Sequence, residues 1–180
     1  MRIVAGQWRG RPLVAPPGRG TRPTSDRARE GLFSMLQSRL GSFEDLRVAD
    51  LFAGTGALGL EALSRGAAHC LFVDSDPQAI AALRRNIDTL GAHDRAEIRT
   101  QRVDHAPPPA RPFDLVLIDP PYAAGLAESA LARIATPAWL APGALLSIET
   151  DRPGLPLPEG LDVETERRFG KAHILLLRWM

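Results

Sequence analysis

The sequence predicts an α/β fold in which a mostly parallel sheet carries helices on both faces. From residue 47 onward, short apolar runs typical of buried strands alternate with segments of helical periodicity. This alternation favours parallel pairing, because each helix returns the chain to the same edge of the sheet. Two consecutive strand patterns, 162–169 and 172–179, surround a tight turn at Gly170 and Lys171. They predict a terminal antiparallel hairpin.

The N-terminal residues have a different character. Residues 2–5 and 12–15 are short extended runs around a Gly/Arg turn, and they predict a small hairpin. Residues 16–24 are rich in Pro, Gly and Arg and predict an exposed loop. A chain of 180 residues suits one compact domain. We therefore expect a single domain with a basic hairpin or arm at 1–24 and the main α/β part at 25–180.

A helix is expected directly after this arm. Thr24 or Ser25 is suited to cap a helix that begins at Asp26, whose acid favours the first turn. Gly41 ends the apolar stripe of this helix.

The repeating part of the chain then supplies strands and helices in turn. Strands are expected at 47–51, 70–74, 96–100, 113–118 and 144–149. Helices are expected at 58–64, at 77 to about 90, and at 126–134. Pro77 suits the first position of its helix. The proline-rich residues 105–112 predict only loop.

The composition excludes several classes of protein. A hydrophobic fraction of 44% is typical of a globular protein, and no apolar run reaches the roughly 18 residues of a membrane span. The first residues lack the apolar stretch of a signal peptide. Cys70 is the single cysteine, so an internal disulfide is impossible. We expect a soluble cytoplasmic protein.

Positive charge is concentrated near the N-terminus. Residues 1–30 contain seven arginines and two acids, although the whole chain has a net charge of only +1. A basic segment on a slightly acidic body suits contact with nucleic-acid phosphates. The alternative is a solvated tail, since the chain uses arginine almost throughout and Lys171 is its only lysine.

A glycine-rich turn follows the first strand of the repeating part. Gly54, Gly56 and Gly59 form a G-x-G-x-x-G pattern, and Asp74 lies 20 residues past Gly54. In a strand-turn-helix context this spacing is typical of a nucleoside site, with the acid placed to bind ribose hydroxyls. The alternative is a tight turn that binds nothing.

The acids around the turn favour one cofactor. Asp50 precedes the turn, where it would repel a pyrophosphate but suits the ammonium group of S-adenosylmethionine, which has no phosphate. Asp104 follows the third strand, where it either accepts from the adenine amine or is an ordinary loop acid. The residues expected to bind this cofactor are Asp50, Phe52, Ala53, Gly54, Gly56, Asp74 and Asp104.

The most informative motif is Asp-Pro-Pro-Tyr at 119–122, directly after the apolar run 113–118. The prolines hold a stiff backbone beyond the end of a buried strand, where open α/β sheets bind ligands. Asp119 and the Pro120 carbonyl are acceptors for the two hydrogens of an NH2 group, and Tyr122 suits stacking on a flat ring. An ordinary end to a strand is the competing interpretation. The four histidines show no metal-ligand spacing, so no metal site is expected.

The chain resembles the RsmD family in four stretches that occur in the same order, 2–11, 22–33, 50–66 and 119–122. Members of this family are bacterial methyltransferases that modify guanine N2 in small-subunit (16S) ribosomal RNA. Residues 168–171 extend this resemblance to the final hairpin. The resemblance implies a Rossmann-like, S-adenosylmethionine-dependent methyltransferase fold with a seven-stranded sheet. The proline-rich loop after Asp104 departs from the family pattern and leaves the adenine contact open.

The resemblance also implies roles for particular residues. Asp119, Pro120, Pro121 and Tyr122 would hold a flipped guanine and form the catalytic group. The N-terminal part would contact RNA through Arg2, Arg9, Arg11, Arg22, Arg27 and Arg29, although Arg27 and Arg29 suit the cofactor carboxylate equally well. The implied partner is 16S ribosomal RNA or an assembling small ribosomal subunit, and we expect a monomer.

Two other classes of function share parts of this pattern. The glycine turn and Asp-Pro-Pro-Tyr also occur in methyltransferases that act on DNA adenine N6 or protein glutamine N5. A nucleotide-binding oxidoreductase or a catalytically silent RNA-binding module is the third interpretation.

Overall fold

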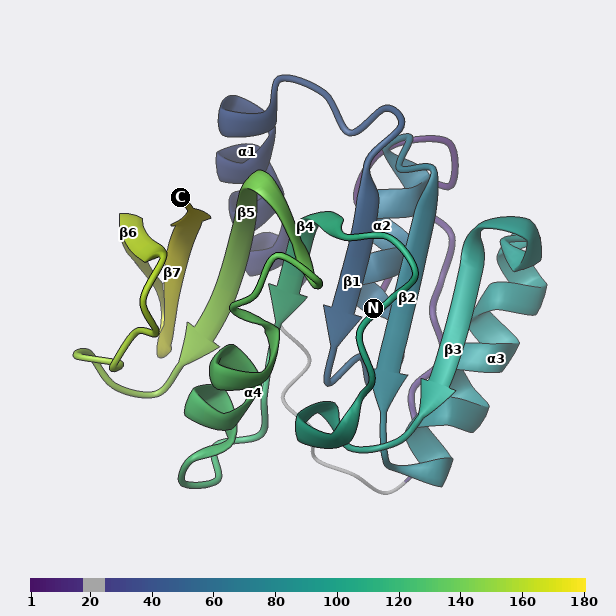
Figure 1. Ribbon diagram of the computed structural model, residues 1–180. Coiled ribbons are helices and arrows are strands. Elements are labelled where there is room, and N and C mark those ends of the chain that lie inside the picture. The colour runs from purple at the N-terminus through teal and green to yellow at the C-terminus, as the bar shows by residue number, and fades with distance from the viewer. Residues whose placement is uncertain (18–24) are drawn as a thin grey trace.

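The computed structural model describes residues 1–17 and 25–180, and the centre of this part of the chain is one seven-stranded sheet (Figure 1). Its strands are β1 (Arg47–Leu51), β2 (His69–Asp74), β3 (Ala96–Thr100), β4 (Phe113–Ile118), β5 (Leu140–Thr150), β6 (Leu161–Phe169) and β7 (Ala172–Trp179). Their order across the sheet is β3-β2-β1-β4-β5-β7-β6. The pairs among β1 to β5 are parallel, and β7 pairs antiparallel with both β5 and β6. The predicted fold class is confirmed.

Helices cover both faces of the sheet. Those of the described chain are α1 (Asp26–Leu40), α2 (Ala57–Ser64), α3 (Pro77–Leu90) and α4 (Leu126–Ile134), with the short 3-10 helices η1 (His93–Arg95) and η2 (Val103–His105). The first three α-helices pack on one face, and α4 and η2 pack on the other (Figure 1). Ser25 caps α1, because its Oγ accepts the N–H of Ala28 across 3.1 Å.

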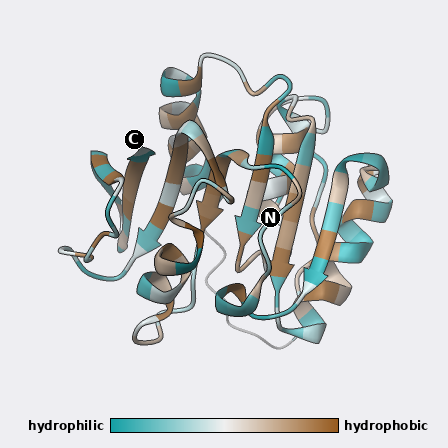
Figure 2. Ribbon diagram, in the orientation of Figure 1, coloured by the Kyte–Doolittle hydropathy of each residue, from teal (hydrophilic) through white to brown (hydrophobic). Residues whose placement is uncertain are grey.

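Alternate residues of each central strand enter opposite hydrophobic cores. In β1, Val48 joins the core beneath α1, α2 and α3, whereas Ala49 and Leu51 join the core beneath α4. Figure 2 shows hydrophobic residues along the central strands and hydrophilic residues on the outer side of α3. Because helices cover both faces of the sheet, the sequences of these strands are continuous apolar runs rather than alternating apolar and polar residues.

The chain changes direction across the sheet between β1 and β4. It runs outward from β1 to β2 and β3, then returns to β4 on the other side of β1. Loops that follow β1 and β4 therefore diverge at the carboxyl edge of the sheet, and this divergence leaves a crevice where such folds bind ligands.

Three local features differ from the sequence prediction. β5 begins at Leu140 rather than at 144, and it includes Gly143 with a φ of 76°. A register shift between Phe113 and Leu115 accommodates this irregular start. The 3-10 helices η1 and η2 were not predicted. The expected N-terminal hairpin is reduced to a single antiparallel bridge between Arg2 and Pro12.

The N-terminal segment is docked on α2 and α3. The N–H groups of Val4 and Ala5 donate to the buried carboxylate of Glu61 across 2.8 and 3.0 Å. Further along the segment, Trp8 N–H donates to Ser64 Oγ across 3.0 Å. Backbone bonds also join the two arms of the segment, from Ile3 N–H to the Arg11 carbonyl across 3.0 Å and from Leu13 N–H to the Met1 carbonyl across 2.9 Å.

Asn86 of α3 holds the second half of the same segment. Its side-chain amide both accepts the N–H of Val14 across 2.8 Å and donates to the Val14 carbonyl across 3.0 Å. Ile3, Trp8 and Leu13 are buried beneath these contacts. No helix within 1–17 and 25–180 is long and apolar enough to cross a membrane.

Candidate active site

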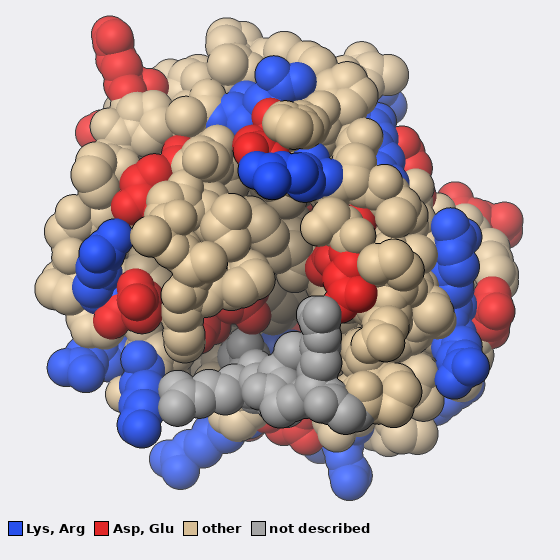
Figure 3. All heavy atoms as spheres, turned by 90° about the horizontal axis from the view of Figure 1, so that it is seen from below, with Lys and Arg blue, Asp and Glu red and all other residues tan. Residues whose placement is uncertain are grey.

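A cavity of about 1080 Å³ opens at the carboxyl edge of the parallel strands. Its walls include the glycine turn after β1, the end of β2, residues after β3, and the Asp-Pro-Pro-Tyr segment after β4. Figure 3 shows this face of the molecule, hollowed near its middle, with acidic side chains beside the hollow and basic side chains both above it and around the outline. The two motifs that the sequence analysis singled out therefore share one cavity.

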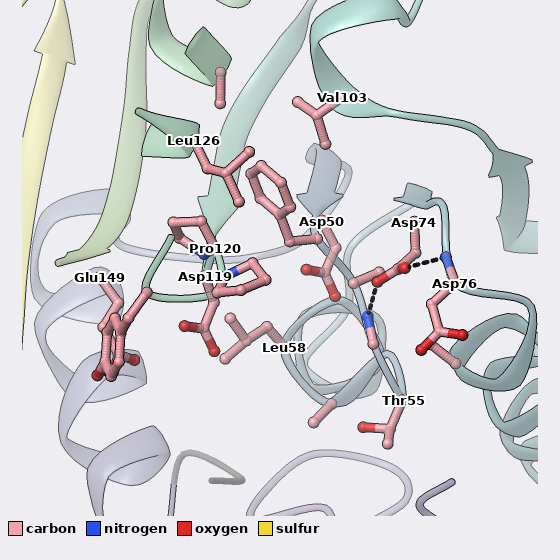
Figure 4. Close-up of a pocket in the computed structure, with 18 of the residues that line it drawn as sticks. Asp50, Thr55, Leu58, Asp74, Asp76, Val103, Asp119, Pro120, Leu126 and Glu149 are labelled. Atoms are coloured by element: carbon pink, nitrogen blue, oxygen red, sulfur yellow. Dashed lines mark hydrogen bonds between the residues drawn. The ribbon is translucent and has the colours of Figure 1, made fainter. Parts of the chain in front are cut away.

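Acidic residues follow the strand order along this cavity. Figure 4 shows Glu149, Asp119, Asp50 and Asp74 in a row from left to right. They lie in or directly after β5, β4, β1 and β2, which are neighbours in that order in the sheet. Because carboxyl ends of parallel strands meet at one edge, four acids distant in sequence line the same space.

The backbone of the glycine turn is in the left-handed region at three positions. Phe52, Gly54 and Gly56 have φ values of 61°, 57° and 81°. Phe52 lacks the conformational freedom of glycine, and such exceptions cluster at ligand sites. The Gly54 N–H donates across 2.8 Å to Asp74 Oδ2, which ties the turn to the end of β2.

Gly56 and Gly59 serve packing rather than the cavity wall. A Cβ on Gly56 would lie 2.3 Å from Leu83 Cδ1, and one on Gly59 would lie 2.4 Å from the Phe72 ring. Gly56 was expected to contact the cofactor, but it does not line the cavity. It caps the N-terminus of α2 against α3 instead.

Asp74 is held in place by two backbone groups. Its Oδ2 accepts from Gly54 N, and its Oδ1 accepts the N–H of Asp76 across 2.8 Å. Each carboxylate oxygen carries a second lone pair, so acceptor capacity toward the cavity is retained. A carboxylate fixed at the end of β2 is suited to binding a pair of hydroxyl groups.

Asp50 is almost completely buried at the end of β1. Its Oδ2 accepts the N–H of Gly59 across 2.8 Å. Burial raises the pKa of Asp50 well above its ordinary value, while the Gly59 bond opposes that rise and the nearby carboxylates of Asp119 and Asp74 add to it. A cation in the cavity would stabilise the ionised form of this residue.

Asp104 reaches the same cavity from η2. Arg102 donates to both of its oxygens, from Nε across 2.9 Å and from Nη2 across 2.7 Å. These hydrogen bonds lower the pKa of Asp104 and hold it ionised. The carboxylate is fixed in orientation by Arg102 and is partly exposed to the cavity.

The Asp-Pro-Pro-Tyr segment forms the opposite wall. Pro120 is buried, whereas the Tyr122 side chain is 51% exposed. The Tyr122 hydroxyl donates to Glu149 Oε1 across 2.9 Å, which fixes the direction of the ring. Asp119, Pro120, Pro121 and Tyr122 all line the cavity. A stiff turn therefore presents a carboxylate, a carbonyl and an aromatic ring to one space.

The basic candidates occupy three different environments. Arg2 and Arg27 are exposed near the start of α1, whose cap residue Ser25 lines the cavity. Arg9 and Arg11 are also exposed, but they lie beside the C-terminal ends of α2 and α3, away from the carboxyl edge of the sheet. Arg22 is a candidate that lies outside the described residues.

Arg29 is buried rather than on the surface, which favours the cofactor carboxylate over RNA among its two expected partners. Its side chain is completely buried, and Nη2 donates to the Arg2 carbonyl and, across 2.9 Å, to Asp26. Nε lies 3.8 Å from the Glu61 carboxylate. Nη1 is buried without a hydrogen-bond partner anywhere in 1–17 or 25–180, and the residue lines the cavity. An anion in the cavity would satisfy this donor.

Several cavity residues were missed by the sequence analysis. Those with polar side chains are Ser25, Thr55, Ser75, Asp76, Gln101, Arg102, Ser129, Glu149 and Lys171. Glu149 gave a usable signal, because it closes a predicted strand, as Asp74 does. The others lie in loops or helices whose approach to the cavity depends on tertiary folding. Within the described part of the chain, no cluster of three or more His, Cys, Asp or Glu side chains could hold a metal ion.

Comparisons with known proteins agree with this geometry. The family described as "Conserved hypothetical protein 95" matches residues 1–178. "Ribosomal RNA small subunit methyltransferase D" of Escherichia coli (strain K12) is 37% identical over 173 residues, covering 95% of this chain and 86% of that protein. The protein of the same name from Haemophilus influenzae is 39% identical over 176 residues, covering 94% and 89%.

Solved structures of methyltransferases are also similar to this chain. A "putative methyltransferase" from Escherichia coli superposes with a TM-score of 0.87 at 36% identity, covering 99% of this chain and 97% of that one. A 16S rRNA N2 methyltransferase of T. thermophilus, solved with AdoMet and guanosine, has a TM-score of 0.67 over 91% of this chain and 46% of its own. At 22% identity, that second likeness shows the fold alone.

Proposed function

Because the chain belongs to the RsmD family, we propose that it transfers a methyl group from S-adenosylmethionine to the exocyclic N2 of a guanine in small-subunit (16S) ribosomal RNA. The observation that carries this proposal is the shared cavity. The glycine turn and Asp74 form its β1–β2 side, and Asp119 to Tyr122 form its β4 side. A nucleoside cofactor and an unstacked base would meet between them.

The β1–β2 side fits S-adenosylmethionine. The amino-acid end of this cofactor is a zwitterion, and the cavity offers a buried carboxylate at Asp50 and the unsatisfied guanidinium nitrogen of Arg29. Asp50 would bind the ammonium group and Arg29 the carboxylate. This assignment gives Arg29 to the cofactor and leaves the exposed Arg27 for RNA.

The nucleoside end fits the remaining acids. Asp74 would accept from the ribose hydroxyls, in an orientation set by Gly54 and Asp76. Asp104, held by Arg102, would accept from the adenine amine. Phe52 and Ala53, directly after β1, also line this side of the cavity. When bound, S-adenosylmethionine supplies a methyl group already activated by its sulfonium.

The β4 side then has to position a weak nucleophile. The lone pair of guanine N2 is conjugated into the ring. Hydrogen bonds from both N2 hydrogens, to Asp119 and to the Pro120 carbonyl, would turn that lone pair toward the methyl group. Asp119 would also stabilise the positive charge that develops on nitrogen. Positioning of this kind is the main contribution that the protein has to make.

Stacking would hold the base after it leaves the RNA helix. Tyr122 is half exposed at the cavity and its hydroxyl is fixed by Glu149, so its ring would serve as the platform for the base. Base–aromatic stacking contributes roughly 1–3 kcal/mol per base. An unpaired guanine is the favoured target, because it costs less to extrude. Pro121 keeps Tyr122 at a fixed distance from Asp119.

Phosphate contacts would come from the exposed arginines. Arg2 and Arg27 lie near the cavity and would contact the strand that carries the target base. Arg9 and Arg11 would contact RNA farther along, over α2 and α3. This distribution suits a structured ribosomal RNA or an assembling subunit better than a single nucleotide.

A methyl-transfer assay tests the proposal. Tritiated S-adenosylmethionine is supplied with 16S RNA, either free or assembled with small-subunit proteins, and the labelled nucleoside is identified by mass spectrometry. We expect N2-methylguanosine at one position. Labelled N6-methyladenosine, methylated glutamine, or no transfer to either RNA form would contradict the proposal. Calorimetric titration with S-adenosylmethionine and with NADH separates this function from an oxidoreductase.

A further inference from the structure

Glu149 occupies the substrate side of the cavity, and nothing above gives it a part in the reaction. It lies near the carboxyl end of β5, whose parallel neighbour is β4. Ile148 is the register partner of Ile118, so Glu149 and Asp119 are the next residues on adjacent strands. Both line the cavity, and Figure 4 shows Glu149 on the side of Asp119 that is farther from Asp50 and Asp74.

The Tyr122 hydroxyl links Glu149 to the base platform. The hydroxyl donates to Glu149 Oε1 across 2.9 Å. A base stacked on the Tyr122 ring, with its amine at Asp119, would have the edge next to that amine directed toward Glu149. In guanine the amine-bearing carbon lies between N1 and N3, and a carboxylate here would meet N1, because only N1 of the two carries a hydrogen.

That ring nitrogen distinguishes guanine from adenine. In guanine, N1 lies next to the carbon that bears the amine and carries a hydrogen, so it donates. In adenine, N1 also lies next to the amine-bearing carbon but has a lone pair, so it accepts. An ionised carboxylate only accepts hydrogen bonds. A carboxylate at this position therefore attracts guanine and repels adenine.

We propose that Glu149 determines the base specificity of the enzyme by accepting the N1–H of the target guanine. The inference rests on the proposed function, because it assumes that the base amine lies at Asp119. Asp119 and the Pro120 carbonyl recognise an NH2 group of any base, whereas Glu149 selects the base that carries it. Loss of a hydrogen bond to a charged group costs roughly 10- to 100-fold in binding.

The test changes both partners of this contact, with a base analogue that lacks the N1 hydrogen and the C6 oxygen, and with a side chain of equal size. Small-subunit RNA is assembled from two pieces so that the target position carries either guanosine or 2-aminopurine riboside. It is used in the form, free or protein-bound, that the wild-type enzyme methylates. 2-Aminopurine keeps the amine but has a lone pair at N1. Glu149→Gln keeps the size of the side chain and adds a donor.

We expect the wild-type enzyme to prefer guanosine over 2-aminopurine by roughly 10- to 100-fold in kcat/KM. In Glu149→Gln this preference should fall at least tenfold, because the amide N–H2 can donate to N1 of 2-aminopurine. Glu128→Gln is the matched control, since Glu128 is paired with Arg152 and does not line this cavity. It should keep the wild-type preference.

Tyr122→Phe separates specificity from positioning. It removes the hydroxyl bond to Glu149 but keeps the ring and the carboxylate, so the preference for guanosine should remain even if the rate falls. An unchanged preference in Glu149→Gln, or an equal loss on both RNAs, would overturn the inference. The proposed function fails separately, if the wild-type enzyme does not methylate guanosine at all.

Discussion

The N–H of Gly59 donates to the buried carboxylate of Asp50 across 2.8 Å, so the end of β1 and the first turn of α2 share one hydrogen bond inside the protein. This bond orients Asp50 but does not remove the cost of burying a charge. Burial raises the pKa of Asp50 well above its ordinary value of 3.8. In the free protein, burial therefore destabilises the ionised form of Asp50 at the place where we expect the cofactor ammonium.

Replacement of Asp50 by Asn should stabilise the free protein and weaken cofactor binding. The folded pKa of Asp50 is raised, so its contribution to stability is present below pH 3.8 and is lost as the pH rises toward the folded pKa. At pH 7, Asp50→Asn should have a higher Tm than wild type, and the gain should disappear near pH 3.8. Scanning calorimetry across this range checks the sign.

Cofactor affinity should depend on the same titration. Ammonium binding requires the ionised form of Asp50, so the affinity for S-adenosylmethionine should increase with pH over the interval above 3.8 in which this acid ionises. In Asp50→Asn it should be about tenfold weaker or more and independent of pH over that interval. Isothermal titration provides both values. A parallel pH dependence in the variant would exclude Asp50 as the ammonium ligand.

Asp119→Ala should nearly abolish methyl transfer while leaving cofactor binding intact. Loss of a group that stabilises developing charge typically lowers kcat by about 100- to 1000-fold. The Kd for S-adenosylmethionine should change less than about threefold, because none of the proposed cofactor ligands lies in the Asp-Pro-Pro-Tyr segment. Asp94→Ala, at an exposed position in η1, is the control. Wild-type rates in Asp119→Ala would remove this residue from the chemistry.

Arg29 and Arg27 can be separated with a truncated ligand. Methylthioadenosine resembles S-adenosylmethionine without its amino-acid end. Arg29→Met should weaken S-adenosylmethionine binding by roughly 10- to 100-fold and leave methylthioadenosine binding unchanged. Arg27→Met, two residues away on the exposed side of α1, should leave both affinities unchanged. A similar loss for both ligands in Arg29→Met would indicate a purely structural role.

Charge reversal at the distant arginines should affect RNA binding without affecting the chemical step. In Arg9→Glu/Arg11→Glu, the Kd for RNA should rise, and its salt dependence should flatten by about one unit of slope for each lost phosphate contact. kcat at saturating RNA should stay at the wild-type value, because both residues lie away from the cavity. Arg111→Glu, in the loop before β4, is the control. Filter binding at several salt concentrations provides the slopes.

Glu61→Gln should destabilise the fold. The buried Glu61 carboxylate accepts two N–H groups of the N-terminal segment and pairs with Arg65 across 3.0 Å. Replacing a buried charge that has several partners typically costs about 3 kcal/mol. Urea unfolding should show this loss, whereas Glu30→Gln, exposed on α1, should have little effect. An unaltered midpoint would mean that the segment docks without a contribution from Glu61, through its bonds to Ser64 and Asn86 and its apolar contacts.

The sequence predicted most of the sheet because its strands have strong local signals. β1, β2 and β4 are short apolar runs with an acid at or next to their last residue, and those acids meet at the carboxyl edge because the strands are parallel. The early start of β5 was missed, because Pro142 and Gly143 are typical of a turn and only the pairing with β4 extends the strand through them.

Docking of the N-terminal segment explains why the burial of three polar residues was not predicted from the sequence. Glu61 and Asn86 are polar residues of helices, and the pattern gave no reason to bury them. They are buried because the N-terminal segment covers them, at separations of 56 or more residues. Arg29 has the same origin, since its neighbours Arg2 and Glu61 are distant in sequence. No local periodicity contains this information.

The docked N-terminal segment constrains the order of events during synthesis. Val4, Trp8 and Val14 leave the ribosome well before Glu61, Ser64 and Asn86, the residues that receive their hydrogen bonds. Until α3 has emerged, Trp8 and Leu13 have no complete surface to cover and are open to chaperones and proteases. Their protection on a nascent chain would therefore mark the moment at which the β1–β2 half of the molecule has folded.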